Sequence, residues 1–214
     1  MTRKLRGELT YWVAAHRGED PALDGGLEHR FRVWQTARLR ELGERLELRD
    51  ERALHAWTSR VQAVEVGPGP IPALGVAPWR AALAVDPLAD GYRAEGLVPT
   101  WAGHVVLASS PGERLPAPSA AFDLAVCENA LDHCEDPALV LRELRRALRP
   151  GGLLWLLVDL MTHRDELHPS PFADEARVRA VLGEAGFRVR WLGAWAGASH
   201  PAAARQCRVL AERG

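Results

Sequence analysis

The apolar positions of the chain follow two different periods, and the change falls near residue 60. In Glu28–Leu48, Leu39, Leu42 and Leu46 recur at steps of three and four residues, which is the pattern of an amphipathic helix. No strand-like apolar run occurs before residue 58. We therefore predict that the first part of the chain is helical, with helices over Glu8–His16, Glu28–Leu48 and Asp50–Trp57.

From Val61 onward, short apolar runs alternate with helical segments. We predict strands over Val61–Val66, Ala81–Val85, His104–Ala108, Phe122–Cys127, Leu153–Val158, Phe187–Trp195 and Gln206–Ala211. Helices are predicted between several of them, over Leu88–Glu95, Pro137–Leu148 and Phe172–Ala185. This alternation is typical of an α/β fold whose parallel sheet is covered on both faces. We divide the chain into a helical segment, residues 1–58, and a core domain, residues 59–214.

The composition argues against nucleic acid and membranes as binding partners. The 214 residues carry 27 Lys and Arg against 28 Asp and Glu, so no strongly basic surface for nucleic acid is expected. Cys127, Cys134 and Cys207 form no CxxC pair, which fits a reducing compartment. The apolar run Leu153–Leu160 is too short to span a bilayer, and no apolar segment follows the basic start of the chain. We expect a cytoplasmic protein that binds neither nucleic acid nor membrane.

We look for binding and catalytic residues at the ends of the predicted strands, because ligands of open α/β sheets bind outside the carboxyl ends of the strands. The first run ends in Glu65–Pro70, where two glycines allow a tight turn and the prolines remove backbone donors. Pro72 also stands where a dinucleotide fingerprint needs its third glycine. The next run ends in Asp86, which can accept hydrogen bonds from ribose hydroxyls. Glu65, Asp86 and a loop poor in donors suit a nucleoside without phosphate, or a cationic ligand.

Two plainer interpretations stay open at these positions. The glycine loop is also what a simple tight turn requires, and Asp86 is also suited to cap a helix. A nicotinamide-dependent oxidoreductase on a similar sheet is a rival class, and Pro72 argues against it.

Several segments in order resemble the motifs of class I S-adenosylmethionine-dependent methyltransferases. Val64–Gly69 resembles the first motif, Ala84–Pro87 the second, and Leu148–Leu154 a recognisable later one. Gly112–Pro116, Ala121–Val126 and Asn129–His133 fit the stretch between them. The resemblance covers residues 61 to about 190. It implies a Rossmann-like, seven-stranded mixed sheet whose last two strands form a hairpin, with the N-terminal helices as a lid.

The resemblance also implies that S-adenosylmethionine is the cofactor, and it assigns roles. Glu65, Gly67, Pro68 and Gly69 would lie near the methionine part, Asp86 and Pro87 at the ribose, Glu113, Arg114 and Leu115 beside the adenine, and Glu128 and Asn129 beneath the sulfonium. Ile71 and Pro111 depart from the family's usual glycine and acid. These departures keep open a non-catalytic member of the fold.

The expected reaction is methylation of a hydroxyl group on a small molecule, of the sugar or secondary-metabolite type. Such an acceptor needs a base, and histidine is suited to this at neutral pH. His133 is the first candidate, His168 the second and His163 the third. Asp159 can orient a histidine or act as the base itself. The alternatives are N-methylation, which needs no dedicated base, and histidines that are merely loop residues.

Three further expectations concern metals, the lid and assembly. Asp132, Asp159, His163 and His168 match no compact ligand motif, so we expect no metal. The N-terminal residues expected to face the acceptor pocket are Tyr11, Trp12, His16, Trp34 and Arg38. The chain is expected to be a monomer or a homodimer.

Overall fold

The computed structural model describes residues 2–20, 26–197 and 202–214 and contains one seven-stranded sheet in the order β3-β2-β1-β4-β5-β7-β6. The strands are β1 (Gln62–Val66), β2 (Ala81–Asp86), β3 (Val106–Ser109), β4 (Phe122–Glu128), β5 (Leu148–Leu160), β6 (Phe187–Ala196) and β7 (Arg205–Arg213). Neighbouring strands from β3 to β5 pair in parallel, and β7 pairs antiparallel with both β5 and β6. The predicted mixed sheet with its C-terminal hairpin is therefore confirmed.

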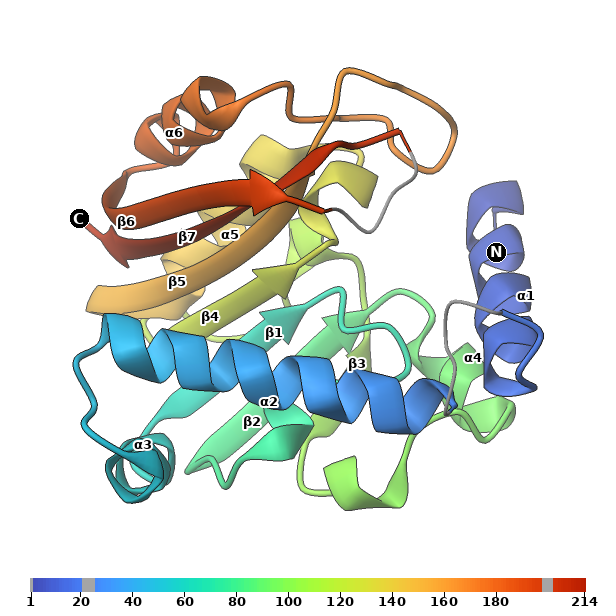
Figure 1. The fold of residues 1–214 in the computed structure, drawn as a ribbon, viewed down its shortest axis with the longest axis horizontal. Helices are drawn as coiled ribbons and strands as arrows, with labels where there is room; N and C mark the ends of the chain where they lie inside the picture. Colours follow the sequence, from blue (N-terminus) through green and yellow to red (C-terminus); the bar gives the residue numbers. More distant parts are fainter. Residues whose placement is uncertain (1, 21–25, 198–201) are drawn as a thin grey trace.

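Helices cover both faces of this sheet (Figure 1). They are α1 (Arg3–His16), α2 (Leu27–Arg45), α3 (Glu51–Thr58), α4 (Ala89–Ala94), α5 (Pro137–Ala147) and α6 (Glu175–Glu184). Val140 and Leu144 of α5 share one core with Val178 and Leu182 of α6. On the opposite face, Leu42 of α2 belongs to a second core that includes Trp155 of β5. Because both faces of the sheet pack against apolar side chains, the strands have the nearly continuous apolar sequences noted above.

The strand β5 begins five residues before the predicted position. Leu148 pairs with Phe122, whereas Leu153 pairs with Leu124. Between these two pairs, four residues of β5 lie opposite one residue of β4, so the register shifts there. The Arg149–Gly152 segment lies between the predicted helix and the predicted strand, and in the structure it is an irregular part of β5.

Two helix starts differ from the prediction because of their caps. The side chain of Thr2 accepts a hydrogen bond from the backbone N–H of Leu5, so α1 begins at Arg3 and not at Glu8. The side chain of Asp174 caps α6 in the same way, so this helix begins at Glu175, after the predicted start at Phe172.

The helix α1 stands at the carboxyl edge of the sheet, on the side toward which the arrowheads of β1 and β4 point (Figure 1). Leu5 and Leu9 pack there against Leu88 and Tyr92, which belong to the β2–α4 region. The helix α2 instead lies along a face of the sheet. In the part of the chain that is described, no helix combines the length and the apolar character needed to cross a membrane.

Candidate functional site

A tight turn after β1 forms the centre of the candidate site. Gly67 and Gly69 have φ angles of 68° and 63°, which residues with a side chain rarely adopt. A β-carbon on Gly67 would lie 2.3 Å from the β-carbon of Ala130, which follows β4. The turn after β1 and the loop after β4 are therefore in contact, and only glycine fits between them.

Glu65 lies beneath this turn and is 3% exposed. Its carboxylate accepts hydrogen bonds from the backbone N–H groups of Ala73 and Leu74, at 3.0 and 3.1 Å. Burial raises the pKa of Glu65 to about 8, and the nearby acids Glu128 and Asp86 add to the rise. The few donors left in the proline-rich loop are thus used by a buried acid of the chain itself.

Asp86 joins the end of β2 to the same turn. Its two carboxylate oxygens accept hydrogen bonds from the backbone N–H groups of Gly69 and Leu88, at 3.2 and 2.8 Å. Burial raises its pKa, and these hydrogen bonds oppose the rise. The bond to Leu88 is the local turn-capping role that the sequence left open, and the bond to Gly69 ties Asp86 to the glycine turn.

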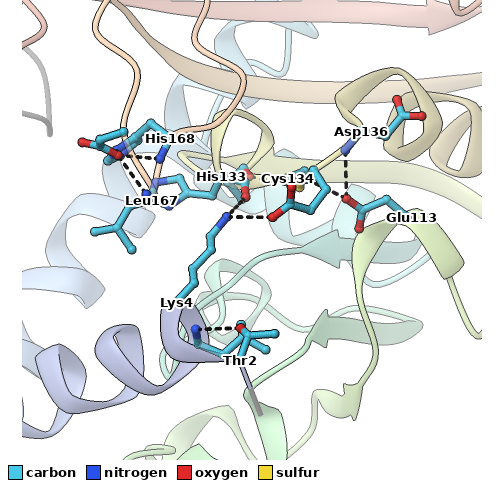
Figure 2. A network of polar contacts seen from close by, with 12 residues as sticks. Thr2, Lys4, Glu113, His133, Cys134, Asp136, Leu167 and His168 are labelled. Atoms are coloured by element: carbon cyan, nitrogen blue, oxygen red, sulfur yellow. Dashed lines mark hydrogen bonds and ion pairs between the residues drawn. The ribbon is translucent and has the colours of Figure 1, made fainter.

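The helix α1 covers the turn. A β-carbon on Gly69 would lie 2.9 Å from the indole ring of Trp12. Glu8, one turn earlier in α1, has its pKa raised to about 7 by burial and by the charge of Asp86. At the start of the helix, Lys4 donates a hydrogen bond to the backbone oxygen of His133 (Figure 2). Three successive turns of α1 thus contact the strand ends.

The helix α2 contributes one more contact to the edge. Arg38 forms an ion pair with Glu128 at 2.8 Å, and Glu128 also accepts a hydrogen bond from the indole N–H of Trp155. Of the five N-terminal residues expected to face a pocket, Trp12 and Arg38 contact residues at this edge. The other three, Tyr11, His16 and Trp34, are exposed.

The residues predicted to lie beside an adenine follow β3 in the short helix η4 (Gly112–Arg114). Glu113 accepts hydrogen bonds from the backbone N–H groups of Glu135 and Asp136, at 3.0 and 3.3 Å (Figure 2). Leu115 is buried and Arg114 is exposed. Glu113 therefore connects the loop after β3 with the loop after β4.

Among the remaining predicted cofactor residues, Pro68 is buried within the turn and Pro87 is exposed after β2. Asn129, directly after β4, has a φ angle of 50°, a left-handed conformation that asparagine tolerates better than most residues. All predicted cofactor residues thus lie at or just beyond the carboxyl ends of β1, β2, β3 and β4.

Two of the predicted catalytic residues lie side by side. The imidazole rings of His133 and His168 are 4.3 Å apart, centroid to centroid (Figure 2). His133 is partly exposed, and His168 is only 6% exposed. Residues 35 positions apart are brought together because one follows β4 and the other follows β5, which are neighbours in the sheet.

Acids surround this histidine pair. Asp132 is 3% exposed, and burial raises its pKa to about 6; Asp159 adds to the rise and His168 opposes it. Asp159 ends the predicted fifth strand and is also 3% exposed. The predicted residues His133, His168 and Asp159 therefore lie near a fourth group, Asp132, which the sequence analysis considered only as a metal ligand.

The sequence analysis missed Asp165. Its carboxylate lies 3.0 Å from Nδ1 of His168 and accepts hydrogen bonds from the backbone N–H groups of Leu167 and His168. These bonds hold the pKa of Asp165 well below its ordinary value. His163, the third candidate histidine, is exposed and contacts the other oxygen of Asp165. The spacing Asp-x-x-His in a loop was the available signal, because an aspartate readily bonds backbone groups two or three residues ahead.

A groove lies at the opposite edge of the sheet. It has a volume of about 520 Å³ and is lined in part by Arg142, Arg145, Arg146 and Arg213. Arg145 already donates to backbone oxygens of Gly186 and Gly214, and Arg146 pairs with Glu143. This groove is far from the strand ends that carry the candidate chemistry, so we do not place the site there.

Comparisons with known proteins identify the domain and the fold. Residues 76–156 match the family model described as a methyltransferase domain. No curated protein matches. Among solved structures, the chain is similar to the 1,6-didemethyltoxoflavin-N1-methyltransferase of Burkholderia thailandensis, determined with 1,6-didemethyltoxoflavin and S-adenosylhomocysteine. The identity is 19%, the TM-score is 0.63, and the match covers 96% of this chain and 86% of that one.

Two further structures show the same fold. A possible histamine N-methyltransferase of Thermotoga maritima is 15% identical with a TM-score of 0.57, covering 98% of this chain and 97% of that one. An S-adenosylmethionine-dependent methyltransferase of Mesorhizobium loti is 17% identical with a TM-score of 0.57, covering 73% and 92%. At such identities the likeness establishes the fold.

Proposed function

We propose that this chain, a class I S-adenosylmethionine-dependent methyltransferase by its fold and its matched domain, methylates a hydroxyl group of a small molecule. S-adenosylmethionine is its cofactor. The observation that supports the proposal is the contact of Gly67 with Ala130, because Ala130 lies three residues before His133 in the loop after β4. The loop that holds the histidine pair therefore meets the glycine turn. The acceptor would lie between the turn and the histidines.

The residues at the turn fit the cofactor in shape and in charge. Gly67 leaves room for Ala130. Gly69 allows a group to approach its backbone closely, and in this structure that group is the indole of Trp12, whose place a ligand would take. Glu65 and Asp86 are buried carboxylates with raised pKa values, so a cationic ligand beside them is favoured. When bound, S-adenosylmethionine supplies a methyl group on a positively charged sulfur. Trp12 now covers Gly69, so we expect α1 to shift or to pack its indole on the cofactor.

Methyl transfer requires the acceptor oxygen, the methyl carbon and the sulfur to lie in line. The acceptor oxygen would take the methyl group that bound S-adenosylmethionine supplies, and a side chain of the protein would take the acceptor's proton. We assign the acceptor's proton to His133, because this ring is partly exposed at the edge while His168 is buried behind it. His168, held by Asp165, and the buried Asp159 complete the proposed catalytic group.

A second candidate reaction is N-methylation of a small molecule. Two of the similar structures are described as N-methyltransferases, and a neutral amine can attack without a dedicated base. A non-catalytic member is the third candidate, since Ile71 replaces a glycine common in the family. Ile71 is 1% exposed and packs with Ala15 and Leu27, so this departure serves the contact between the turn and the N-terminal helices.

The test uses the full chain with S-adenosylmethionine labelled in its methyl group and a panel of small hydroxyl and amine compounds. We expect label in a hydroxyl compound and at least a hundredfold lower rate for His133→Ala, with unchanged cofactor affinity. His55→Ala is the matched control, because His55 is an exposed histidine of α3. Label only in amines would favour N-methylation, and cofactor binding without transfer to any compound would favour the non-catalytic member.

We further propose that the partner is a small molecule and not a nucleic acid, that the protein acts in the cytoplasm, and that it is a monomer or a homodimer. The near balance of 27 basic and 28 acidic residues supports the first point. Light scattering of the purified chain, with and without cofactor, measures the assembly state.

A further inference from the structure

Three side chains at the carboxyl edge offer ligand atoms to one point. One atom from each of Asp132, His133 and His168 lies within 4.8 Å of the other two. Asp132 and His133 belong to the short helix η5 (Leu131–His133) after β4, and His168 lies in the loop after β5. Ligands around a tetrahedral zinc ion lie about 3.4 Å apart when bonds are about 2.0–2.1 Å long. Small side-chain rotations would bring the three atoms into that range.

The carboxylate of Asp132 has an unsatisfied oxygen. The residue is 3% exposed, and its Oδ1 atom is buried without a hydrogen-bond partner. Leaving a buried carboxylate oxygen without a partner is costly, and such an atom calls for a water or an ion. This observation is independent of the spacing of the three ligand atoms.

The orientation of His168 also suits a ligand. Its Nδ1 atom lies 3.0 Å from Oδ1 of Asp165, and a carboxylate can only accept. Nδ1 must therefore carry the hydrogen, so in the neutral ring the lone pair is on Nε2. A carboxylate that fixes a histidine in this way is the usual outer partner of metal-bound imidazole.

We propose that Asp132, His133 and His168 form a binding site for a divalent transition-metal ion, with Zn²⁺ the best match. Two imidazoles and one carboxylate suit zinc, whereas Mg²⁺ and Ca²⁺ prefer oxygen ligands alone. Three protein ligands leave a fourth position open to water or to another small ligand. This proposal departs from the sequence-based expectation of no metal, because ligands contributed by two separate loops leave no compact motif in the sequence.

The surrounding charges favour a cation. Asp132 and Asp159 are both buried carboxylates at this edge of the sheet, each 3% exposed. The ammonium of Lys4 is directed to the backbone oxygen of His133 and to Glu135. Two buried carboxylates therefore face one ammonium that other acceptors already hold, and a divalent ion would offset the excess of negative charge.

The site has a consequence for methyl transfer, and this part rests on the proposed function. An imidazole lone pair cannot hold a metal ion and accept a proton at the same time. Because His133 is the proposed base, bound zinc would block proton acceptance. We therefore expect zinc to inhibit the methyltransferase reversibly.

Zinc binding is tested first on the chelator-treated full chain, without methyl donor or acceptor. Zn²⁺ is titrated by calorimetry, and Co²⁺ is used as a spectroscopic probe of four-coordinate geometry. We expect one Zn²⁺ per chain, no comparable binding of Mg²⁺, and at least tenfold weaker Zn²⁺ binding in His168→Ala and Asp132→Asn. Asp165→Asn should weaken binding about 10- to 100-fold, because it replaces the charged acceptor that orients His168 with a neutral amide. His55→Ala is again the control.

The outcomes separate the site from the proposed function. Absence of saturable Zn²⁺ binding, or equal affinity in the variants, overturns the metal site and leaves the methyltransferase proposal intact. Where Asp132→Asn does not fold, His168→Ala and Asp165→Asn carry the test. Stoichiometric binding with reversible inhibition of methyl transfer supports both proposals. Stoichiometric binding with faster methyl transfer supports the site and overturns the role of His133 as the base.

Discussion

A β-carbon placed on Gly67 would lie 2.3 Å from the β-carbon of Ala130, closer than two such atoms come in folded proteins. The contact joins the turn after β1 to the loop after β4, so the cofactor turn and the proposed acceptor region depend on one glycine. A side chain at position 67 would separate them.

The first prediction isolates this contact with a matched pair of variants. Gly67 and Gly96 have the same φ angle of 68°, but a β-carbon on Gly96 would meet nothing within 4 Å. Gly96→Ala should therefore cost only the left-handed backbone strain, about 1–2 kcal/mol. Gly67→Ala should cost about 1–3 kcal/mol more, because the β-carbon overpacks against Ala130. Urea denaturation measures both values, and equal losses would show that the contact is absent.

Asp86 carries the second prediction. If its carboxylate binds the ribose, Asp86→Asn should weaken the affinity for S-adenosylhomocysteine by about 1–3 kcal/mol. Asp90→Asn is the control, because Asp90 is exposed on α4 and pairs only with Arg93. Calorimetry measures both affinities. An unchanged affinity in Asp86→Asn would remove this residue from the cofactor site and leave its bonds to Gly69 and Leu88 as its role.

The third prediction concerns Trp12, which covers the glycine turn after β1. Trp12 lies on Gly69, so binding of S-adenosylhomocysteine must change the surroundings of its indole. We expect a change in tryptophan fluorescence on titration and a clearly smaller change in Trp12→Phe. Trp34→Phe is the control, since Trp34 is 37% exposed on α2 and packs against Phe31. If Trp12→Phe gives the full wild-type signal, α1 does not respond to the cofactor.

The sequence predicted the sheet well because its central strands β1, β4 and β5 are largely buried on both faces. Runs such as Phe122–Cys127 are therefore apolar throughout and stand out from the helices around them. The same physical fact predicted Glu65 and Asp86, since a buried acid at the end of an apolar run is conspicuous.

The start of α1 and the role of Asp165 could not be predicted in this way. Lys4 and Glu8 are polar and interrupt the apolar period, yet both are largely buried because α1 stands against the strand ends. Their burial depends on tertiary contacts, which cannot be recognised from the local sequence pattern. Asp165 lies in a loop without periodicity, and its importance comes from His168, three residues ahead.

The last prediction follows from the pKa of Glu65. This group ionises near pH 8 in the folded chain but near 4.5 when unfolded, so between these values the folded state holds a proton that the unfolded state has lost. Stability of the cofactor-free protein should therefore fall as the pH rises from about 5 to 8. A single group of this kind contributes about 1.4 kcal/mol per pH unit. Glu8, with a pKa of about 7, acts in the same direction.

Glu65→Gln keeps the shape of the protonated acid and removes its titration. The decline of the unfolding free energy with pH should be shallower in this variant than in the wild type, while Glu44→Gln, which changes an exposed acid of α2, should follow the wild type. A cationic cofactor favours ionised Glu65, so binding of S-adenosylmethionine at pH 7 should release protons. Calorimetry in buffers of different ionisation enthalpy measures that release. If Glu65→Gln shows the same decline with pH and the same proton release as the wild type, Glu65 is ionised throughout and the buried acid does not meet the cofactor's charge.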